Sequence, residues 1–169
     1  HYARGMAYAR TERPDEAAKE LASLRKAAAD PVLEDLTLKG IDDLAALLSL
    51  AEASLRGEIL LARRQYRAAL AALRQAVELE DALESEEPPP WPVPSRQSLG
   101  AALLLAGQPQ QAAAVFGADL ERHPDNGWDP YGLAESLRRS KRGAEARAAD
   151  ARFAAAWKDA DSGPPDTRY

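Results

Sequence analysis

Histidine is the commonest general base and metal ligand near neutral pH, and the 169-residue chain contains two, His1 and His123. His1 opens the sequence, and His123 lies in the turn HPDNG at residues 123–127. A turn histidine is more typically solvated than bound to a ligand, so we interpret His123 as a solvated turn residue. The chain has no cysteine, which excludes disulfides, thiolate catalysis and zinc–cysteine sites.

Adjacent carboxylates are the second set of residues that could do acid–base or calcium chemistry. Examples are Asp42–Asp43, Glu80–Asp81 and Glu86–Glu87. Neighbouring positions on a helix point to different sides, so we interpret these pairs as solvated or helix-end charge and retain only Glu86–Glu87 as a candidate. The motifs of phosphate-binding loops, serine hydrolases, zinc proteases and dinucleotide-binding folds do not occur. The sequence therefore predicts a protein that is not an enzyme and needs no cofactor or metal.

The charge balance narrows the class of partner. Lys and Arg number 22 against 27 Asp and Glu, a formal net charge of −5, whereas a nucleic-acid binder would show a clustered basic face. No apolar run approaches the roughly 20 residues of a membrane span. Neither nucleic acid nor a membrane is therefore expected as a partner, and the compartment is not indicated. Because the sequence begins at His1 without an initiator Met, we expect the C-terminal part of a longer protein, with a processed start as the alternative.

The segment EEPPPWPVP at residues 86–94 interrupts a sequence rich in alanine and leucine. Five of its last seven residues are proline, which cannot continue a helix because it lacks the N–H donor and clashes with the preceding turn. Trp91 either folds back as a core anchor, which we favour because large aromatic side chains are usually at least half-buried, or is presented to a partner together with Glu87. Trp157 follows Phe153 by four positions, a spacing that predicts an aromatic stripe sealing the last helix.

A recurring pair of small residues predicts helix hairpins. A small residue precedes an alanine by twelve positions at Gly5 and Ala17, Gly57 and Ala69, Gly100 and Ala112, and Ala134 and Ala146. Small side chains at both places let two paired helices approach closely. The pattern predicts hairpins at about 1–30, 51–82, 95–125 and 127–160.

The spacing between these pairs locates two insertions. Ala112 and Ala146 are 34 positions apart, whereas Ala69 and Ala112 are 43 apart, an excess of nine that matches residues 86–94. Ala17 and Ala69 are 52 apart, and we place this larger excess within 30–50. We predict an irregular helical insertion there, either a longer helix pair with a loop around Lys39–Gly40 or an extra short helix.

The third segment resembles the tetratricopeptide repeat, whose unit has about 34 residues and the pattern W-x2-L-G-x2-Y…A-x3-F…P. Its matching residues are Leu99, Gly100, Leu103, Gly107, Ala112, Phe116 and Pro124. The first segment resembles the repeat through Gly5, Tyr8 and Ala17, while Arg64 and Lys141 stand in place of the inter-helix glycine in the second and fourth. The stretches HYARG, EPPPWPVPSRQSLGAALL, DLERHPDNGW and RFAAAW also resemble a bacterial family of longer tetratricopeptide-repeat proteins without a defined function.

The resemblance implies an all-α fold, a right-handed superhelix of tetratricopeptide-like hairpins forming one domain over residues 1–169. Its concave side would be lined by the first helix of each hairpin. The groove candidates are then Tyr2, Met6, Glu58, Gln97, Leu104, Trp128, Tyr131, Glu135 and Arg138. The positions at which a carboxylate-clamping variant needs Lys and Asn hold Ser54, Glu58, Gln97 and Ala101, so a chaperone-tail clamp is not expected.

The implied role is a non-catalytic scaffold for protein–protein interaction within a longer protein. Its partner would be a protein or peptide. The alternative is a capping or oligomerisation module of a longer repeat protein, whose enzymatic or metal-dependent activity would lie outside this sequence. In that case the partner would be preceding repeats of the same chain or a second copy.

Overall fold

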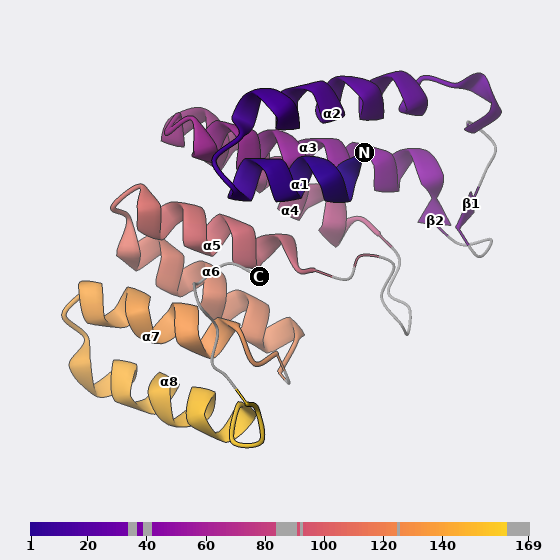
Figure 1. Cartoon of the computed structure of the whole chain (residues 1–169). Helices are drawn as coiled ribbons and strands as arrows, with labels where there is room; N and C mark the ends of the chain where they lie inside the picture. Colours follow the sequence, from indigo (N-terminus) through magenta and orange to yellow (C-terminus); the bar gives the residue numbers. More distant parts are fainter. Residues whose placement is uncertain (34–36, 39–41, 84–90, 92, 125, 162–169) are drawn as a thin grey trace. The chain divides into compact units, whose positions relative to one another are not determined.

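The computed structural model describes residues 1–33, 37–38, 42–83, 91, 93–124 and 126–161 (Figure 1). Over these residues the protein consists of eight α-helices, one short 3₁₀ helix and two paired two-residue strands, so the all-α prediction is confirmed. The helices are α1 Tyr2–Arg10, α2 Pro14–Ala28, α3 Leu44–Ala62, α4 Tyr66–Asp81, α5 Ser95–Leu105, α6 Pro109–Arg122, α7 Asp129–Arg139 and α8 Gly143–Ala156. Within this described part, no helix is long and apolar enough to cross a membrane.

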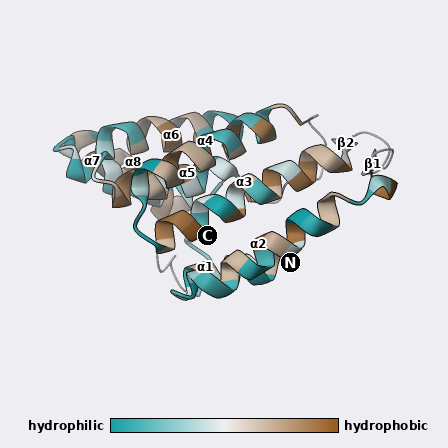
Figure 2. Ribbon diagram, turned by 90° about the horizontal axis from the view of Figure 1, so that it is seen from above, coloured by the Kyte–Doolittle hydropathy of each residue, from teal (hydrophilic) through white to brown (hydrophobic). Residues whose placement is uncertain are grey.

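The chain divides into two compact units, His1–Ser95 and Arg96–Tyr169. In the first unit, α3 packs on α1, α2 and α4. In the second unit, α7 packs on α6 and α8. Apolar and polar residues alternate along the helices (Figure 2), as expected for helices that bury one face against neighbours and expose the other.

The same turn closes each helix pair. One residue of every turn has a positive φ, between 58° and 72°: Glu12, Arg64, Gly107 and Lys141. The next residue donates its backbone N–H to the carbonyl five positions back at 2.8–2.9 Å: Arg13 to Tyr8, Gln65 to Leu60, Gln108 to Leu103 and Arg142 to Leu137. A residue with left-handed backbone conformation, followed by a residue whose N–H bonds to the carbonyl five positions back, is the Schellman motif of helix C-termini. Four turns of different sequence therefore share one backbone geometry.

Small residues bring neighbouring helices into close contact. A Cβ added at Gly5 would lie 2.6 Å from Leu55, and one at Gly57 would lie 2.6 Å from Leu73. The alanines of the predicted pairs are buried, with at most 2% exposed: Ala17, Ala69, Ala112 and Ala146. Gly57 thus allows close packing within its own hairpin, whereas Gly5 allows close packing of α1 on α3 of the next hairpin.

Phe116 joins three helices of the second unit. Its ring lies against Gly100 of α5, where an added Cβ would be 2.6 Å away, and against Gly132 of α7. The side chain is only 1% exposed. A fully buried aromatic ring stabilises a fold by about 2–3 kcal/mol, so Phe116 is a main element of this core.

The segment 30–50, where we predict an insertion, contains short elements and the beginning of α3. Pro31–Leu33 is a 3₁₀ helix, and β1 (Thr37–Leu38) pairs antiparallel with β2 (Asp42–Asp43). Residues 44–50 are the first turns of α3, which bury Leu47 and Leu50. The first helix of the second hairpin is thus longer than the hairpin predicted at 51–82, which is one of the two alternatives for 30–50. The predicted loop at Lys39–Gly40 lies outside the described residues, as does Glu87.

Candidate binding surfaces

The predicted groove residues of the first unit lie close to Trp91. The Tyr2 and Trp91 rings are 5.2 Å apart, tilted by 56°, and both side chains are half-buried. Trp91 also packs against the buried cluster of Leu50, Ala53 and Ala76, and Met6 packs against the same cluster as Tyr2. In this unit Trp91 therefore holds α1 in place, which agrees with its interpretation as an anchor.

A polar network lies beneath Tyr2. Burial, with the charge of Glu58 as the second cause, raises the pKa of Tyr2 to about 12. Glu58 is only 1% exposed, and its carboxylate accepts a hydrogen bond from Arg10 at 3.4 Å. Glu58 is therefore an internal partner of Arg10 in this structure, not a surface residue.

Two predicted groove residues of the second unit are also buried. Gln97 is 3% exposed and Leu104 is 5% exposed, while the next residue, Leu105, is 50% exposed. Successive helical positions differ by about 100° in direction, which explains why adjacent leucines have such different surroundings. The prediction that Gln97 and Leu104 face a partner is therefore wrong for this structure.

Glu135 and Arg138 form an ion-pair network on α7. Arg138 donates to both carboxylate oxygens of Asp150 at 2.9 and 3.0 Å, and Glu135 accepts from Arg139 at 2.6 Å. The hydrogen bond from Arg139 lowers the pKa of Glu135, and the one to Asp150 raises the pKa of Arg138. These charges lie at the surface and are paired with each other, linking α7 to α8.

Four half-buried aromatic rings form a continuous row in the second unit. Trp128 contacts Trp157 edge to face at 5.3 Å, Trp157 lies 5.9 Å from Phe153, and Phe153 lies 5.5 Å from Tyr131. The structure thus brings the predicted groove residues Trp128 and Tyr131 together with the stripe predicted to seal the last helix. Offset and edge-to-face contacts of this kind are favourable for aromatic pairs.

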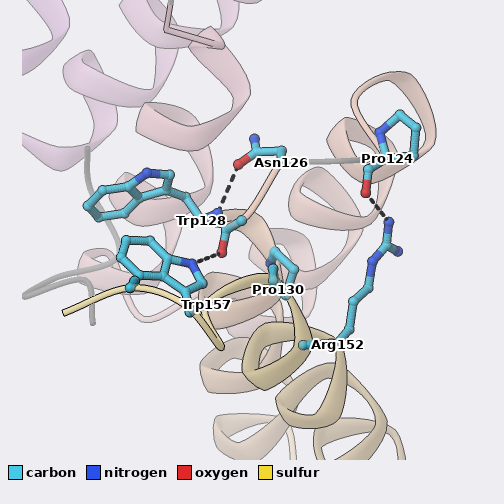
Figure 3. Close-up of a pocket in the computed structure, with 10 residues that line it drawn as sticks. Pro124, Asn126, Trp128, Pro130, Arg152 and Trp157 are labelled. Carbon is cyan, nitrogen blue, oxygen red and sulfur yellow. Dashed lines mark hydrogen bonds between the residues drawn. The ribbon is translucent and has the colours of Figure 1, made fainter. Parts of the chain in front are cut away.

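One end of the aromatic row borders a pocket of about 550 Å³, here called the tryptophan pocket (Figure 3). It is lined by Pro124, Asn126, Gly127, Trp128, Pro130, Arg152, Ala155, Ala156, Trp157 and Ala160. The Trp157 indole N–H donates to the Gly127 carbonyl at 2.7 Å, and Arg152 donates to the Pro124 carbonyl at 2.7 Å. Among these lining residues, Arg152 is the only charged one. Trp, Pro and Ala residues supply most of the lining, but polar atoms make up about half of the pocket surface, and one cation lies at its border.

A pair of buried carboxyl groups supports the loop that lines the pocket. Asp119 of α6 and Asp129 of α7 are both 0% exposed. The Asn126 amide donates to Asp119 at 3.2 Å and to Asp129 at 2.8 Å, while its own oxygen accepts the Trp128 backbone N–H at 2.9 Å. Asn126 therefore connects both carboxyl groups to the backbone of a pocket residue.

Burial beside Asp119 also affects the proton affinity of Asp129. Burial, followed by the hydrogen bond with Asp119 and its charge, raises the pKa of Asp129 to about 10. The raised pKa favours the protonated, neutral form of Asp129. His123 also reaches this pair, with its Nδ1 3.0 Å from Asp119, and is half-buried; the sequence-based view of a solvated turn residue missed this contact.

Sequence reasoning found the aromatic residues but missed Asp119, Asn126 and Asp129. The only available signal was the density of Asp and Asn in PDNGWDP at residues 124–130, which indicates local side-chain bonds to a turn. Within the described residues, no group of three or more His, Asp or Glu side chains could hold a metal ion.

The chain matches no protein-family model, no curated protein and no solved structure. Its function must therefore be inferred from its own residues and their geometry.

Proposed function

We propose that the protein is a non-catalytic scaffold for protein–protein interaction, built of tetratricopeptide-like hairpins and part of a longer protein. The observation that carries this proposal is the equivalence of the four turns. In each, the residue with positive φ stands five positions before a buried alanine, as Glu12 does before Ala17 and Gly107 before Ala112. One hairpin geometry in four different sequences is what a repeat architecture requires.

The packing within each unit gives further support. In the first unit, α3 contacts both helices of the preceding hairpin, α1 and α2. In the second unit, Phe116 lies between Gly100 of α5 and Gly132 of α7. The first helix of one hairpin thus packs on the hairpin before it, which is how helix pairs stack into a superhelix. We propose that all four hairpins stack in this manner and form a right-handed superhelix.

The surroundings of the titratable groups favour a non-catalytic role. Asp129 has the most unusual proton affinity described above, but its side chain is 0% exposed. A general acid must come within hydrogen-bond reach of its substrate, and Asn126 occupies that position at 2.8 Å. The carboxyl pair is therefore better explained as support for a loop than as an acid–base catalyst.

The proposed partner-binding surface is the exposed side of α7, around Tyr131 and Arg138. Tyrosine and arginine are enriched in the energetically important parts of interfaces. Tyr131 is half-buried against Phe153, so its ring is already fixed before a partner arrives. Arg138 is exposed and held by Asp150. A rigid aromatic ring beside a positioned cation suits a protein or peptide partner.

The test is affinity capture with the full-length protein, followed by binding of each captured partner to the purified chain. We expect Arg138→Glu and Tyr131→Ala to weaken the binding of a true partner at least tenfold. Arg63→Glu is the matched control, because Arg63 is an exposed arginine that pairs with a carboxylate, Asp15 at 2.8 Å, in the other unit. Equal loss of binding in the control, or no partner that binds the purified chain, would count against the scaffold.

A further inference from the structure

We propose that the tryptophan pocket binds a small carboxylate that carries an aromatic ring, with the ring on the two indoles and the carboxylate on Arg152. The pocket lies within the second unit, and its volume of about 550 Å³ falls in the range of about 300–1,000 Å³ that is typical of small-molecule sites. The proposal does not rest on the scaffold function, because its ligand is a small molecule and no partner protein takes part in its test.

The walls of the pocket are fixed before a ligand arrives. The Trp157 indole N–H donates to the Gly127 carbonyl, and a Cβ at Gly127 would lie 2.9 Å from the indole nitrogen. The backbone of Trp128 is held by Asn126, which two buried carboxyl groups hold in turn. Walls that are held in this way lose little conformational entropy when a ligand binds.

The aromatic row indicates a ring as one part of the ligand. Tyr131, Phe153, Trp157 and Trp128 follow one another at centroid distances of 5.3–5.9 Å, and the last two line the pocket. A ligand ring on these half-buried indoles would continue the row with tilted or edge-to-face contacts, which are favourable for aromatic pairs. A saturated ring of the same size would lack these contacts.

Arg152 determines where the second part of the ligand lies. Figure 3 shows the two indoles on one side of Pro130 and the Arg152 guanidinium on the other, so a ligand that reaches both carries its polar group on a short chain away from its ring. The guanidinium has five N–H donors, and the Pro124 carbonyl accepts one of them at 2.7 Å. This bond positions the group, and its remaining donors suit a carboxylate.

The charges around the pocket favour an anion over a cation. Indole faces alone would attract a cation. Arg152 is the one charged side chain among the described lining residues, and it repels a cation but attracts a carboxylate. The two acidic side chains that support the loop, Asp119 and Asp129, are 0% exposed, so neither can contact a bound cation.

The test titrates the full chain, labelled with 5-fluorotryptophan, with 4-(2-naphthyl)butanoate and follows the ¹⁹F NMR spectrum. The chain has three tryptophans, and Trp→Phe variants at 91, 128 and 157 assign the three resonances. We expect saturable shifts of the Trp128 and Trp157 resonances and no shift of Trp91, which packs on Tyr2 in the first unit.

Two further probes test the two parts of the ligand separately. The primary amide of the same acid should bind about two- to fivefold more weakly, which is the effect expected for an exposed ion pair. The saturated analogue 4-(2-decalinyl)butanoate keeps the charge and nearly the size, and should bind about two- to tenfold more weakly because it lacks the aromatic contacts.

Matched substitutions test the role of Arg152. Arg152 and Arg147 are both exposed on α8, but only Arg152 lines the pocket. Arg152→Gln should remove the preference for the acid over its amide, Arg152→Lys should keep part of it, and Arg147→Gln should leave it unchanged. The ligand-free spectrum of each variant shows whether the indoles have kept their surroundings, and Arg152→Lys decides if those of Arg152→Gln have changed.

Four outcomes would overturn the proposal. The acid moves neither pocket resonance, or it moves that of Trp91 as much. The acid binds no tighter than its amide or than the saturated analogue. The corresponding amine, 4-(2-naphthyl)butylamine, binds tighter than the acid. Arg147→Gln reduces the preference for the acid as much as Arg152→Gln does.

Discussion

The protonation of Asp129 makes the stability of the turn between α6 and α7 depend on pH. Its side chain bonds to Asn126, which bonds to the backbone of Trp128. Its pKa, raised by burial to about 10 from an ordinary 3.8, means that the folded chain keeps a proton that the unfolded chain releases near pH 4. The contribution of this group to the free energy of unfolding is therefore greatest below pH 4 and falls as the pH rises toward 10.

Asp129→Asn should remove this pH dependence. The asparagine amide can donate to Asp119 as the protonated carboxyl does, and its oxygen can still accept from Asn126. We expect the variant to be more stable than the parent at neutral and alkaline pH, with the gain growing by at most about 1.4 kcal/mol per pH unit. Urea unfolding of both proteins at pH 5 and pH 9 measures this difference.

The control for this experiment is Asp15→Asn. Asp15 is exposed and pairs with Arg63 at 2.8 Å, so its loss should change stability by less than 1 kcal/mol at either pH. His123 and Arg152, which act on the carboxyl pair, are left in place in both variants. A gain for Asp129→Asn that is equal at pH 5 and pH 9 would show that Asp129 is ionised in the folded chain.

At the scale of elements, the turns show that helix packing can impose a backbone conformation on an unfavourable residue. Gly107 adopts positive φ readily. For Glu12, Arg64 and Lys141 the same backbone conformation raises the free energy of the folded chain by about 1–2 kcal/mol per residue. Their side chains do not favour this geometry. The close contacts between the paired helices hold it.

Gly107→Ala and Gly117→Ala should have opposite effects on stability. A Cβ at either glycine would meet nothing within 4 Å, but only Gly107 has a positive φ, +72°. We expect Gly107→Ala to lower the free energy of unfolding by about 1 kcal/mol. Gly117 lies inside α6, so Gly117→Ala should raise it by about 0.5–1 kcal/mol. Urea unfolding of the two variants checks both signs, and a loss at both positions would contradict the backbone explanation.

The helix pairs could be predicted from the sequence because the twelve-residue spacing of small side chains is a local pattern. It treated Arg64 and Lys141 as departures from the pattern, although both have the same φ as Gly107 within 14°, because packing overrides local preference. It could not find the Asp119–Asp129 pair, since these residues lie ten positions apart and only the turn between α6 and α7 brings them together. The burial of Glu58 and Leu104 depends on which helices pack against theirs, and helical periodicity in the sequence does not identify those helices.

For the whole molecule, the division into two compact units predicts that a cavity made in the core of one unit destabilises that unit and not the other. Leu55 and Phe116 are matched sites, because each is at most 1% exposed and each lies against glycine, Leu55 on Gly5 and Phe116 on Gly100. Leu55→Ala should cost about 2–5 kcal/mol and Phe116→Ala about 3–5 kcal/mol. If each unit has its own core, the substitution should lower the local stability of helices in its own unit first.

Amide hydrogen exchange measures this response helix by helix. We expect Leu55→Ala to speed exchange in α1–α4 and Phe116→Ala to speed it in α5–α8, with the other unit retaining the parent rates. Phe116→Leu, which leaves a smaller cavity, should give the same distribution with a smaller change, so the result survives if the alanine variant unfolds. Should either variant speed exchange equally in all eight helices, the chain unfolds as one cooperative solenoid, because every hairpin then depends on its neighbours for its stability.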